Sequence, residues 1–362
     1  SRGLGDVYKR QTEGNKQGLH TKWYENGQNY EEENYKDGLK HGSWNVWYEN
    51  DGSMFRGTYK NGKKDGLFTD WHANGHKKLE GKYQDDLWVG KWTSWYENKQ
   101  IMQEGSYKDG KQDGLHTTWY ENGKKNSENT YKNGELNEVH SWQYYKNGQN
   151  KSERTFKNGK KDGLNIEWYK NGKKASEGTY KAGKEDGLLT IWNEDGNKYL
   201  EESYKDGHKD GLFTLYEDGQ KHREGSYLDR KKNGLFTEWY NNGQKKQEGF
   251  FKEGRLSGRW AYWDEEGHKY SEETFNDGKK DGLFIEYHPN GQKSTEESWK
   301  EDKKDGLFTE WYENGQKKQE GELGNFNYKL GKWSYWKEDG NKYLEETFKD
   351  GKKDGLMTGW YP

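Results

Sequence analysis

The chain has 362 residues and is polar but nearly neutral, which narrows the kinds of protein it can be. Hydrophobic residues make up only 27% of it, too few for ordinary compact cores, yet aromatic residues reach 16% and there are just 2 prolines. Disordered chains are poor in aromatic residues and strongly charged, so we expect a folded protein whose burial depends on aromatic rings. The 61 basic and 64 acidic residues are interspersed, which disfavours nucleic acid or an anionic membrane as a partner.

Further classes are excluded by residues that the sequence lacks. There is no cysteine, so neither a disulfide framework nor a thiolate metal site can form, and redox chemistry does not indicate the compartment. No apolar run approaches the roughly 20 residues that span a bilayer, and membrane insertion is not expected. The cytoplasm and the cell surface both stay open as locations.

The two ends are expected to be artificial. The run from Asp6 to Gln11 resembles one reading frame of an adapter used in transposase-based DNA library preparation, so residues 1–11 are predicted to be a non-native leader. Residues 12–362 are predicted to form one continuous array. Because the chain stops at Pro362 within a unit, we expect a fragment of metagenomic origin whose last repeat is truncated.

From residue 12 onward the sequence repeats with a period of 24 residues. Each unit is anchored on the glycine of an Asp-Gly-Leu motif or its equivalent, and the spacing departs from 24 at three places. The spacing to the preceding anchor is 25 residues at Val139 and at Gly331, and the spacing from Gly211 to the next anchor is 23 residues. A fixed period of this length indicates a repeat architecture. The fifteen units begin at Gly18, Gly42, Gly66, Gly90, Gly114, Val139, Gly163, Gly187, Gly211, Gly234, Gly258, Gly282, Gly306, Gly331 and Gly355.

Each unit is predicted to be a β-hairpin. Asn-Gly between two β-rich runs, as at Asn74-Gly75 and Asn314-Gly315, is a strong hairpin signal and favours a primed turn. A second turn, such as the one from Lys60 to Gly66, joins one hairpin to the next. The predicted fold is therefore all-β, with tandem 24-residue hairpins forming an elongated, twisted, open sheet. A β-propeller is the alternative, since two units make a blade of about 48 residues.

Aromatic residues recur at fixed positions of the unit. The second strand ends on an aromatic residue with a glycine two residues earlier, as in Gly81-Lys82-Tyr83, which leaves space for a neighbouring ring to lie across the backbone. Another position is filled almost always by tryptophan, and we expect this tryptophan column to be structural. Its members are Trp23, Trp47, Trp71, Trp95, Trp119, Trp168, Trp192, Trp239, Trp263, Trp311, Trp336 and Trp360.

The repeated residues resemble a known family. Trp-Tyr-Glu-Asn-Gly followed by Lys-Lys-x-Glu-Gly-x-Tyr-Lys-x-Gly-Lys, seen in full or nearly so over 119–134 and 168–183, is similar to the bacterial variant of the MORN repeat found in YwqK-like antitoxin components. The resemblance implies an elongated single-layer hairpin array that acts in protein association. Some units depart from the pattern: Val139 replaces the anchor glycine, and Tyr144, Leu215 and Tyr287 are assigned to the tryptophan column.

No set of residues in the repeat favours catalysis. A site must be unique and preorganised, whereas a repeat presents the same groups everywhere. The pair His72 and His76 flanks a turn and is interpreted as exposed turn residues rather than a metal site. Adjacent glutamates such as Glu201 and Glu202 are expected on opposite strand faces, so they would not form a catalytic pair. No catalytic residue, metal site or cofactor is predicted.

Four units replace the usual Leu-Phe pair with a polar residue and a tryptophan. An exposed tryptophan on a rigid sheet could bind a partner, and these four are the candidate partner contacts. The competing interpretation, which we favour, is that they fill the packing position of Phe68 or Phe308. The four residues are Trp44, Trp92, Trp260 and Trp333.

The sequence favours a non-enzymatic repeat scaffold that mediates protein–protein association. Two alternatives stay open: an antitoxin or immunity-type protein that binds and neutralises a toxin, which the resemblance implies, and a cell-surface module that binds glycan or matrix. A protein partner is expected, with self-association as a further option.

Overall fold

The computed structural model describes residues 6–8, 11–12, 14–49, 52–324 and 327–360. It divides the chain into two compact units. Unit 1 comprises Ser1–Gly172 with Tyr180–Gly183, and unit 2 comprises Lys173–Thr179 with Lys184–Pro362. The described residues fold into β-strands joined by turns. No helix among them is long and apolar enough to cross a membrane.

Unit 1 is an antiparallel meander in which each long strand pairs with its neighbours in sequence. Its strands are β1 (Asp6–Tyr8), β2 (Gln11–Thr12), β3 (Asn15–Lys16), β4 (Gly18–Trp23), β5 (Asn29–Lys36), β6 (Leu39–Trp47), β7 (Ser53–Lys60), β8 (Lys63–Lys64), β9 (Gly66–Trp71), β10 (Lys77–Gln84), β11 (Leu87–Trp95), β12 (Ile101–Lys108), β13 (Lys111–Gln112), β14 (Gly114–Trp119), β15 (Lys125–Lys132), β16 (Glu135–Tyr144), β17 (Asn150–Lys157) and β18 (Lys160–Trp168).

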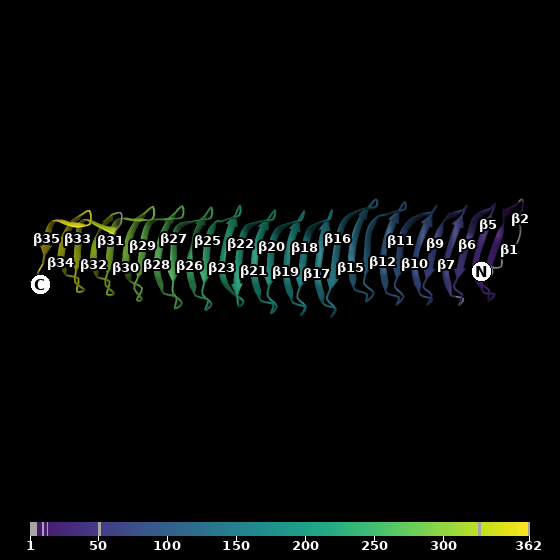
Figure 1. The fold of residues 1–362 in the computed structure, drawn as a ribbon, viewed down its shortest axis with the longest axis horizontal. Coiled ribbons are helices and arrows are strands. Elements are labelled where there is room, and N and C mark those ends of the chain that lie inside the picture. The colour runs from purple at the N-terminus through teal and green to yellow at the C-terminus, as the bar shows by residue number, and fades with distance from the viewer. Residues whose placement is uncertain (1–5, 9–10, 13, 50–51, 325–326, 361–362) are drawn as a thin grey trace. The chain divides into compact units, whose positions relative to one another are not determined.

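Unit 2 repeats the same meander, and Figure 1 shows its strands side by side in chain order. Strand β19 (Lys174–Lys181) has residues in both units. The others are β20 (Lys184–Trp192), β21 (Lys198–Lys205), β22 (His208–Glu217), β23 (Gln220–Leu228), β24 (Lys231–Lys232), β25 (Gly234–Trp239), β26 (Lys245–Lys252), β27 (Arg255–Trp263), β28 (Lys269–Asn276), β29 (Lys279–Tyr287), β30 (Lys293–Lys300), β31 (Lys303–Trp311), β32 (Lys317–Gly324), β33 (Tyr328–Trp336), β34 (Lys342–Lys349) and β35 (Lys352–Gly359).

The predicted open hairpin array is confirmed, and the propeller alternative is wrong. A propeller would break the chain into separate four-stranded sheets, whereas pairing in unit 2 runs from β20 to β35 without such a break. In the segment predicted as a leader, residues 6–8 form β1 and pair with β4, in the register Asp6↔Lys22. Residues 1–5 and 9–10 of that segment lie outside the described residues, and its non-native origin stays a prediction.

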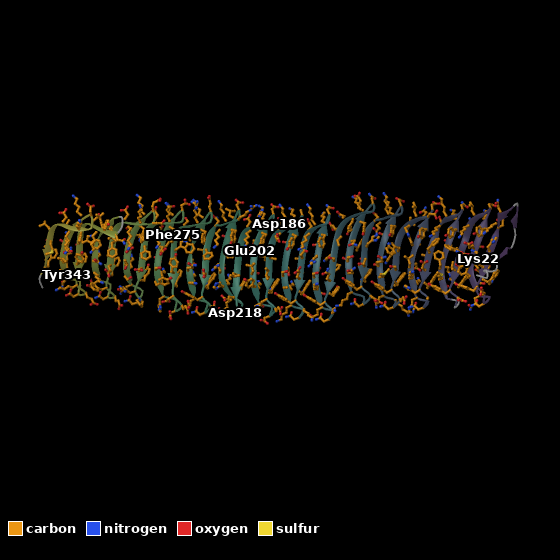
Figure 2. The ribbon with its side chains drawn as sticks, viewed as in Figure 1. Lys22, Asp186, Glu202, Asp218, Phe275 and Tyr343 are labelled. Atoms are coloured by element: carbon orange, nitrogen blue, oxygen red, sulfur yellow. The ribbon has the colours of Figure 1, made fainter. Side chains whose placement is uncertain are left out.

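The two kinds of turn lie at opposite ends of the strands. In Figure 2, Asp218 in a hairpin turn and Asp186, near the start of β20 and just after a connecting turn, lie on opposite sides. The turn that joins successive hairpins is the primed one: Asn61 and Gly62 both have positive φ, at 48° and 83°, as a type I′ turn requires. At the Asn-Gly turn only the glycine does, for example Gly75 at 80°. Its N–H donates to the carbonyl of His72 at 2.9 Å, which is a three-residue loop with a glycine bulge. The sequence predicted a primed turn at Asn-Gly, but the primed turn is the one that joins successive hairpins.

One face of the sheet, here called the aromatic face, carries the buried rings. The second residue after the anchor lies there, and Phe68, Trp260 and Trp333 are only 1–2% exposed. Each ring lies over a glycine of the adjacent strand. A Cβ built on Gly57 would lie 2.5 Å from Phe68 Cε1, so only glycine leaves room for the ring. The predicted packing of a ring across a glycine is confirmed.

The opposite face, here called the leucine face, carries the tryptophan column. Its members are half-buried, except Trp360, which is 44% exposed. The most deeply buried rings are therefore those of the aromatic face. In the repeat that begins at Gly211 the column position is filled by Tyr216. Tyr216 pairs with Lys221, as Trp239 pairs with Lys245. The sequence-based assignment of Leu215 to the column is wrong, because the column residue is the fifth after each anchor, and the fifth residue after Gly211 is Tyr216.

The spacing exceptions are absorbed in different ways. After Gly211 the missing residue shortens the hairpin loop to the two residues Asp218 and Gly219, both with positive φ. Before Gly331 the strand register is the ordinary one, with Glu320 paired to Ser334 as Glu80 is to Thr93. The remaining extra residue, before Val139, changes the register itself.

Candidate functional site

The hairpin tips are tied together by a ladder of side-chain hydrogen bonds from each repeat to the next. The tyrosine that follows the column residue donates its hydroxyl to the backbone carbonyl of the next column tryptophan, as Tyr24 does to Trp47 at 2.7 Å and Tyr240 to Trp263 at 2.9 Å. The turn asparagine adds a second bond, from Asn242 Nδ2 to the carbonyl of Glu265 at 2.6 Å. These bonds thus tie each hairpin tip to the next through the backbone carbonyls of the column tryptophans and of the turn.

The two neighbouring histidines belong to this ladder. His72 Nε2 lies 2.9 Å from the carbonyl of Trp95, where other repeats have a tyrosine hydroxyl, and His76 Nδ1 lies 2.7 Å from the carbonyl of Glu97. Each ring therefore has one nitrogen on a backbone carbonyl. Over the described ranges of the chain, no group of three or more His, Asp and Glu side chains is placed to hold a metal ion.

The adjacent glutamates separate as strand alternation predicts. Glu201 pairs with Lys198 at 2.6 Å on the leucine face, while Glu202 pairs with Lys209 at 2.6 Å on the aromatic face. Glu202 occupies the position that holds the ring-bearing glycine in other repeats, and Tyr204 donates to it at 2.6 Å. These carboxylates are anchored in ion pairs on different faces, so they do not converge on a common substrate position.

The leucine face presents a row of exposed aliphatic side chains, here called the leucine row. Each follows an anchor glycine directly, and the most exposed in the interior of unit 2 are Leu212 at 72% and Leu307 at 63%. Leucines of neighbouring repeats lie two strands apart, which is a distance of about 10 Å. The members are Leu19, Leu67, Leu115 and Leu164 in unit 1 and Leu188, Leu212, Leu235, Leu283, Leu307 and Leu356 in unit 2.

Polar residues interrupt the leucine row wherever the next residue is a buried tryptophan. Lys91 pairs with Glu104 at 2.9 Å, Arg259 pairs with Glu272, and Lys332 pairs with Glu345 at 2.8 Å. The row also has a flanking line of Lys-x-x-Glu ion pairs, for example Lys245 with Glu248 at 2.6 Å. The leucine face therefore alternates apolar side chains with locally neutral charge pairs.

The four candidate partner tryptophans lie on the aromatic face. Trp92, Trp260 and Trp333 are buried, at 8%, 2% and 1% exposure, and Trp44 is half-buried. The indole Nε1 of Trp260 donates to the carbonyl of Phe250 at 3.1 Å. Three of the four indoles therefore offer almost no surface to a partner. The exposed leucines, which the sequence reading did not single out, offer more.

The register changes between β15 and β16. In repeats of ordinary length the fourteenth residue after an anchor pairs with the third residue after the next anchor, as Glu104 does with Thr117. Here Glu128 pairs with His140, the first residue after Val139. Anchor glycines adopt positive φ, such as 99° at Gly163, and Val139 does not; a β-branched residue is strained in that region. The bulge that remains leaves only Asn137 unpaired, where an ordinary repeat leaves two residues unpaired, and the hairpin is shifted by two residues.

The slide opens a hollow of about 540 Å³ at the hairpin tips. Tyr120 donates to the carbonyl of Trp142 at 3.2 Å instead of that of the column residue Tyr144, which projects farther along the strand direction. The rings of Tyr120 and Tyr144 meet edge to face, with 5.8 Å between centroids. The lining residues are Tyr120, Asn122, Gln143, Tyr144, Tyr145, Lys146 and Lys151.

The geometry of the array agrees with the comparison to known families. Segments 16–37, 88–109, 112–133, 161–182, 232–253, 280–301 and 304–325 match the MORN repeat variant. The chain carries seven such MORN repeats in tandem. The shifted hairpin of β16 and β17 falls between two of the matched segments, 112–133 and 161–182, so the hollow arises where the MORN pattern lapses.

Comparison with whole proteins adds little beyond the MORN repeats. No curated protein matches the chain. Among solved structures, "Crystal Structure of TcdB2-TccC3-TEV" and "Crystal Structure of TcdB2-TccC3" are each 9% identical, with a TM-score of 0.22. The alignments cover 95% and 98% of this chain but only 20% and 22% of those chains. The chain thus spans about a fifth of the length of the structures it is aligned with.

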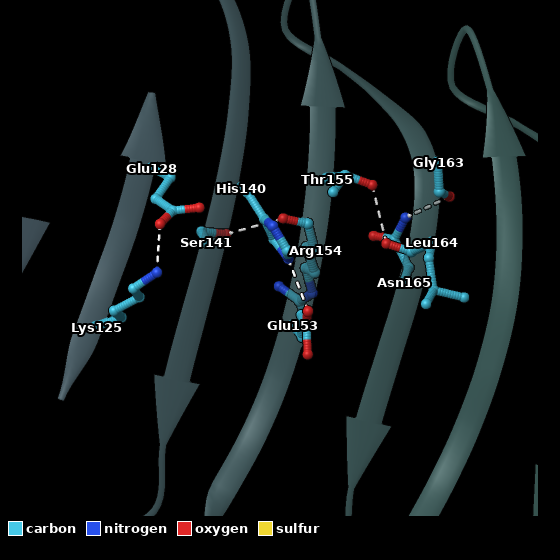
Figure 3. A network of polar contacts seen from close by, with 10 residues as sticks. All are labelled: Lys125, Glu128, His140, Ser141, Glu153, Arg154, Thr155, Gly163, Leu164 and Asn165. Atoms are coloured by element: carbon cyan, nitrogen blue, oxygen red, sulfur yellow. Dashed lines mark hydrogen bonds and ion pairs between the residues drawn. The ribbon is translucent and has the colours of Figure 1, made fainter. Parts of the chain in front are cut away.

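A network of polar contacts lies on the shifted hairpin of β16 and β17 (Figure 3). His140 Nε2 lies 2.8 Å from Glu153, and the imidazole stacks on the indole of Trp142. The hydroxyl of Ser141 instead donates to the carbonyl of Arg154 at 3.5 Å. Because Ser141 and His140 are adjacent strand residues, their side chains point to opposite faces. The network therefore does not place a nucleophile beside the imidazole.

Carboxylates of the hairpins are held ionised by their neighbours. Burial raises the pKa of Glu238, but the hydrogen bond from Gln247 at 2.7 Å, the charge of Arg223 and the bond from Lys246 outweigh it, so the pKa is lowered overall. Bonds from Lys332 and Lys342 lower the pKa of Glu345 to about 2. A carboxyl with a lowered pKa stabilises the folded state at neutral pH.

Acid is therefore expected to destabilise the fold through these carboxylates. A lowered folded-state pKa stabilises the fold above the ordinary pKa of about 4.5, and this stability is lost as the pH falls toward 2. Glu345→Gln should lower the melting temperature at pH 7 and leave it unchanged at pH 2. Thermal unfolding followed by circular dichroism across this range checks it, with exposed Glu266→Gln as the control. Equal effects of the two substitutions at pH 7 would contradict the assignment.

Proposed function

We propose that this protein is a non-enzymatic scaffold that binds a protein partner through the leucine row. Exposed leucines at a fixed position in ten of the repeats support the proposal. Leu212 and Leu307 remain 72% and 63% exposed within a packed sheet. Large apolar side chains that recur exposed along one face offer a partner a line of apolar contacts. Leucines of neighbouring repeats lie about 10 Å apart, which suits a partner that presents apolar side chains at matching intervals.

The charges along the row support a protein partner over a polyanion. The Lys-x-x-Glu pairs, such as Lys293 with Glu296, are internally compensated, so the face has no extended basic stripe. Arg259 and Lys332 interrupt the row singly, each already beside a glutamate. Isolated charges of this kind favour register and specificity in an interface more than long-range attraction.

A binding role rather than an enzymatic one is also part of the proposal. The ionisable side chains examined above, including His72, Glu202 and His140, are engaged in ladders or ion pairs. An antitoxin is the special case in which the partner is a toxin. Bacterial origin and this special case rest on the resemblance of the repeat alone.

The double substitution Leu212→Ser and Leu307→Ser is expected to weaken partner binding at least tenfold. It should change the free energy of unfolding by no more than about 0.5 kcal/mol, because exposed side chains contribute little to folding. Tyr199→Ser, which removes a 54% exposed ring outside the row, is the control and should leave binding intact.

Calorimetry measures binding of this protein to the proteins encoded by the genes that flank its gene. The same measurement with a second copy of the chain tests self-association. A partner whose affinity is unchanged by the double substitution, or lowered equally by Tyr199→Ser, would overturn the leucine row as the contact surface. Proteins bound by the wild type and lost by the double variant would identify the partner.

A further inference from the structure

The hollow at the shifted hairpin is built by a specific structural event. Val139 lacks the positive φ of the anchor glycines, only a smaller bulge at Asn137 remains, and β16 is shifted by two residues. Tyr120 therefore reaches Trp142 instead of Tyr144. The result is a hollow of about 540 Å³ whose lining includes both tyrosine rings, which pack edge to face against each other. It lies wholly within unit 1, at the hairpin tips and away from the leucine row.

The lining of the hollow has a distinct chemistry. It combines three tyrosine rings, the amides of Asn122 and Gln143, and two lysines, with no carboxylate and no aliphatic side chain. Tyrosine rings offer flat faces to C–H groups, and primary amides both donate and accept hydrogen bonds. A ligand with one apolar face and many hydroxyl groups matches this set.

The charge at the tip that carries Lys146 differs from that of many other repeats. The position of Lys146 is acidic in many units, for example Glu25, Glu97 and Glu313. Among the described residues, neither Lys146 nor Lys151 forms an ion pair with a carboxylate. Two uncompensated ammonium groups at the edge of a hollow favour an anionic ligand.

We propose that this hollow binds an acidic sugar of the hexuronate class, with the sugar ring against the tyrosines and its carboxylate toward Lys146 and Lys151. The amides of Asn122 and Gln143 pair with the ring hydroxyl groups. A peptide fits less well, because β16 is already paired on both sides with β15 and β17 and offers no free edge to add a strand. The lining also lacks a pocket for an aliphatic side chain.

The first test measures binding of tri-galacturonate to the full chain by calorimetry, with neutral maltotriose as the comparison sugar. We expect saturable binding of tri-galacturonate that is at least tenfold tighter than that of maltotriose. Lys146→Ala with Lys151→Ala should weaken it at least tenfold. The matched control, Lys78→Ala with Lys82→Ala, removes two exposed lysines from an ordinary repeat and should leave binding unchanged.

The second test removes the hollow but keeps its lysines. Deleting Asn137 and changing Val139 to glycine restores the ordinary spacing and anchor, so Tyr120 should return to the carbonyl of Tyr144 and the hollow should close. Binding of tri-galacturonate should then be lost while the circular dichroism spectrum is retained. No saturable binding by the wild type, equal weakening by the control pair, or unchanged binding after this repair would each overturn the proposal.

Discussion

Gly249→Ala is expected to destabilise unit 2 by about 3 kcal/mol, the upper range for overpacking a core. The added Cβ would lie 2.2 Å from Cδ2 of Trp260. The indole cannot move aside easily, because it is 2% exposed and its Nε1 is hydrogen-bonded to the carbonyl of Phe250 at 3.1 Å. A single methyl group should therefore open the packing between β26 and β27.

The matched control is Gly178→Ala. There the new Cβ would meet Cδ1 of Leu189 at 3.0 Å, the far end of a flexible side chain that can rotate away. Gly178→Ala should be nearly neutral, because replacing glycine also reduces the entropy of the unfolded chain by about 0.4–1 kcal/mol. Chemical denaturation gives the free energies, and hydrogen exchange reports whether β26 and β27 lose protection. Equal stability of the two variants would show that the ring does not need the glycine.

Trp333→Ala is expected to cost about 3–5 kcal/mol, the range for truncating a large buried aromatic side chain. The ring is 1% exposed, lies over Gly321 and contacts Phe308, with 5.6 Å between the ring centroids. Its removal leaves a void bounded by a glycine that has no side chain to fill it. Because each repeat contacts mainly its neighbours, the loss should be confined to the adjoining hairpins.

Trp360→Ala, at a column residue that is 44% exposed, serves as the control and should cost much less. Denaturation and hydrogen exchange of β32 to β34 measure both variants. A small effect of Trp333→Ala would mean that the indole is not a packing residue. In that case the candidate role of Trp44, Trp92, Trp260 and Trp333 in partner binding would regain support, and changing all four to phenylalanine would test it.

Several features were predictable because they depend on local sequence. The glycine two residues before an aromatic residue indicated that a ring crosses the backbone, and Phe68 over Gly57 does so. The adjacent Glu201 and Glu202 were expected on opposite faces and pair with different lysines. Both follow from strand alternation, which is a property of the backbone and does not depend on the neighbours.

Other features were misjudged because they depend on contacts between repeats. Asn-Gly indicated a primed turn, but at this end of the strands the tyrosine and asparagine ladder holds a three-residue loop, and the primed turn lies at the opposite end. The conspicuous tryptophan column was expected to be structural, but it is not the most deeply buried position. The rings over the glycines are buried more deeply instead, because an adjacent backbone covers them.

The sequence by itself determined the period, the hairpin unit, the positions of the turns and the open all-β class, because these follow from alternation and from the conformational freedom of glycine. Only the tertiary structure decided which face buries its rings, which leucines stay exposed and what an extra residue does. The single insertion before Val139 shifts the register, whereas the one before Gly331 does not. The outcome depends on whether the anchor residue can adopt positive φ, and thus on how one hairpin pairs with the next.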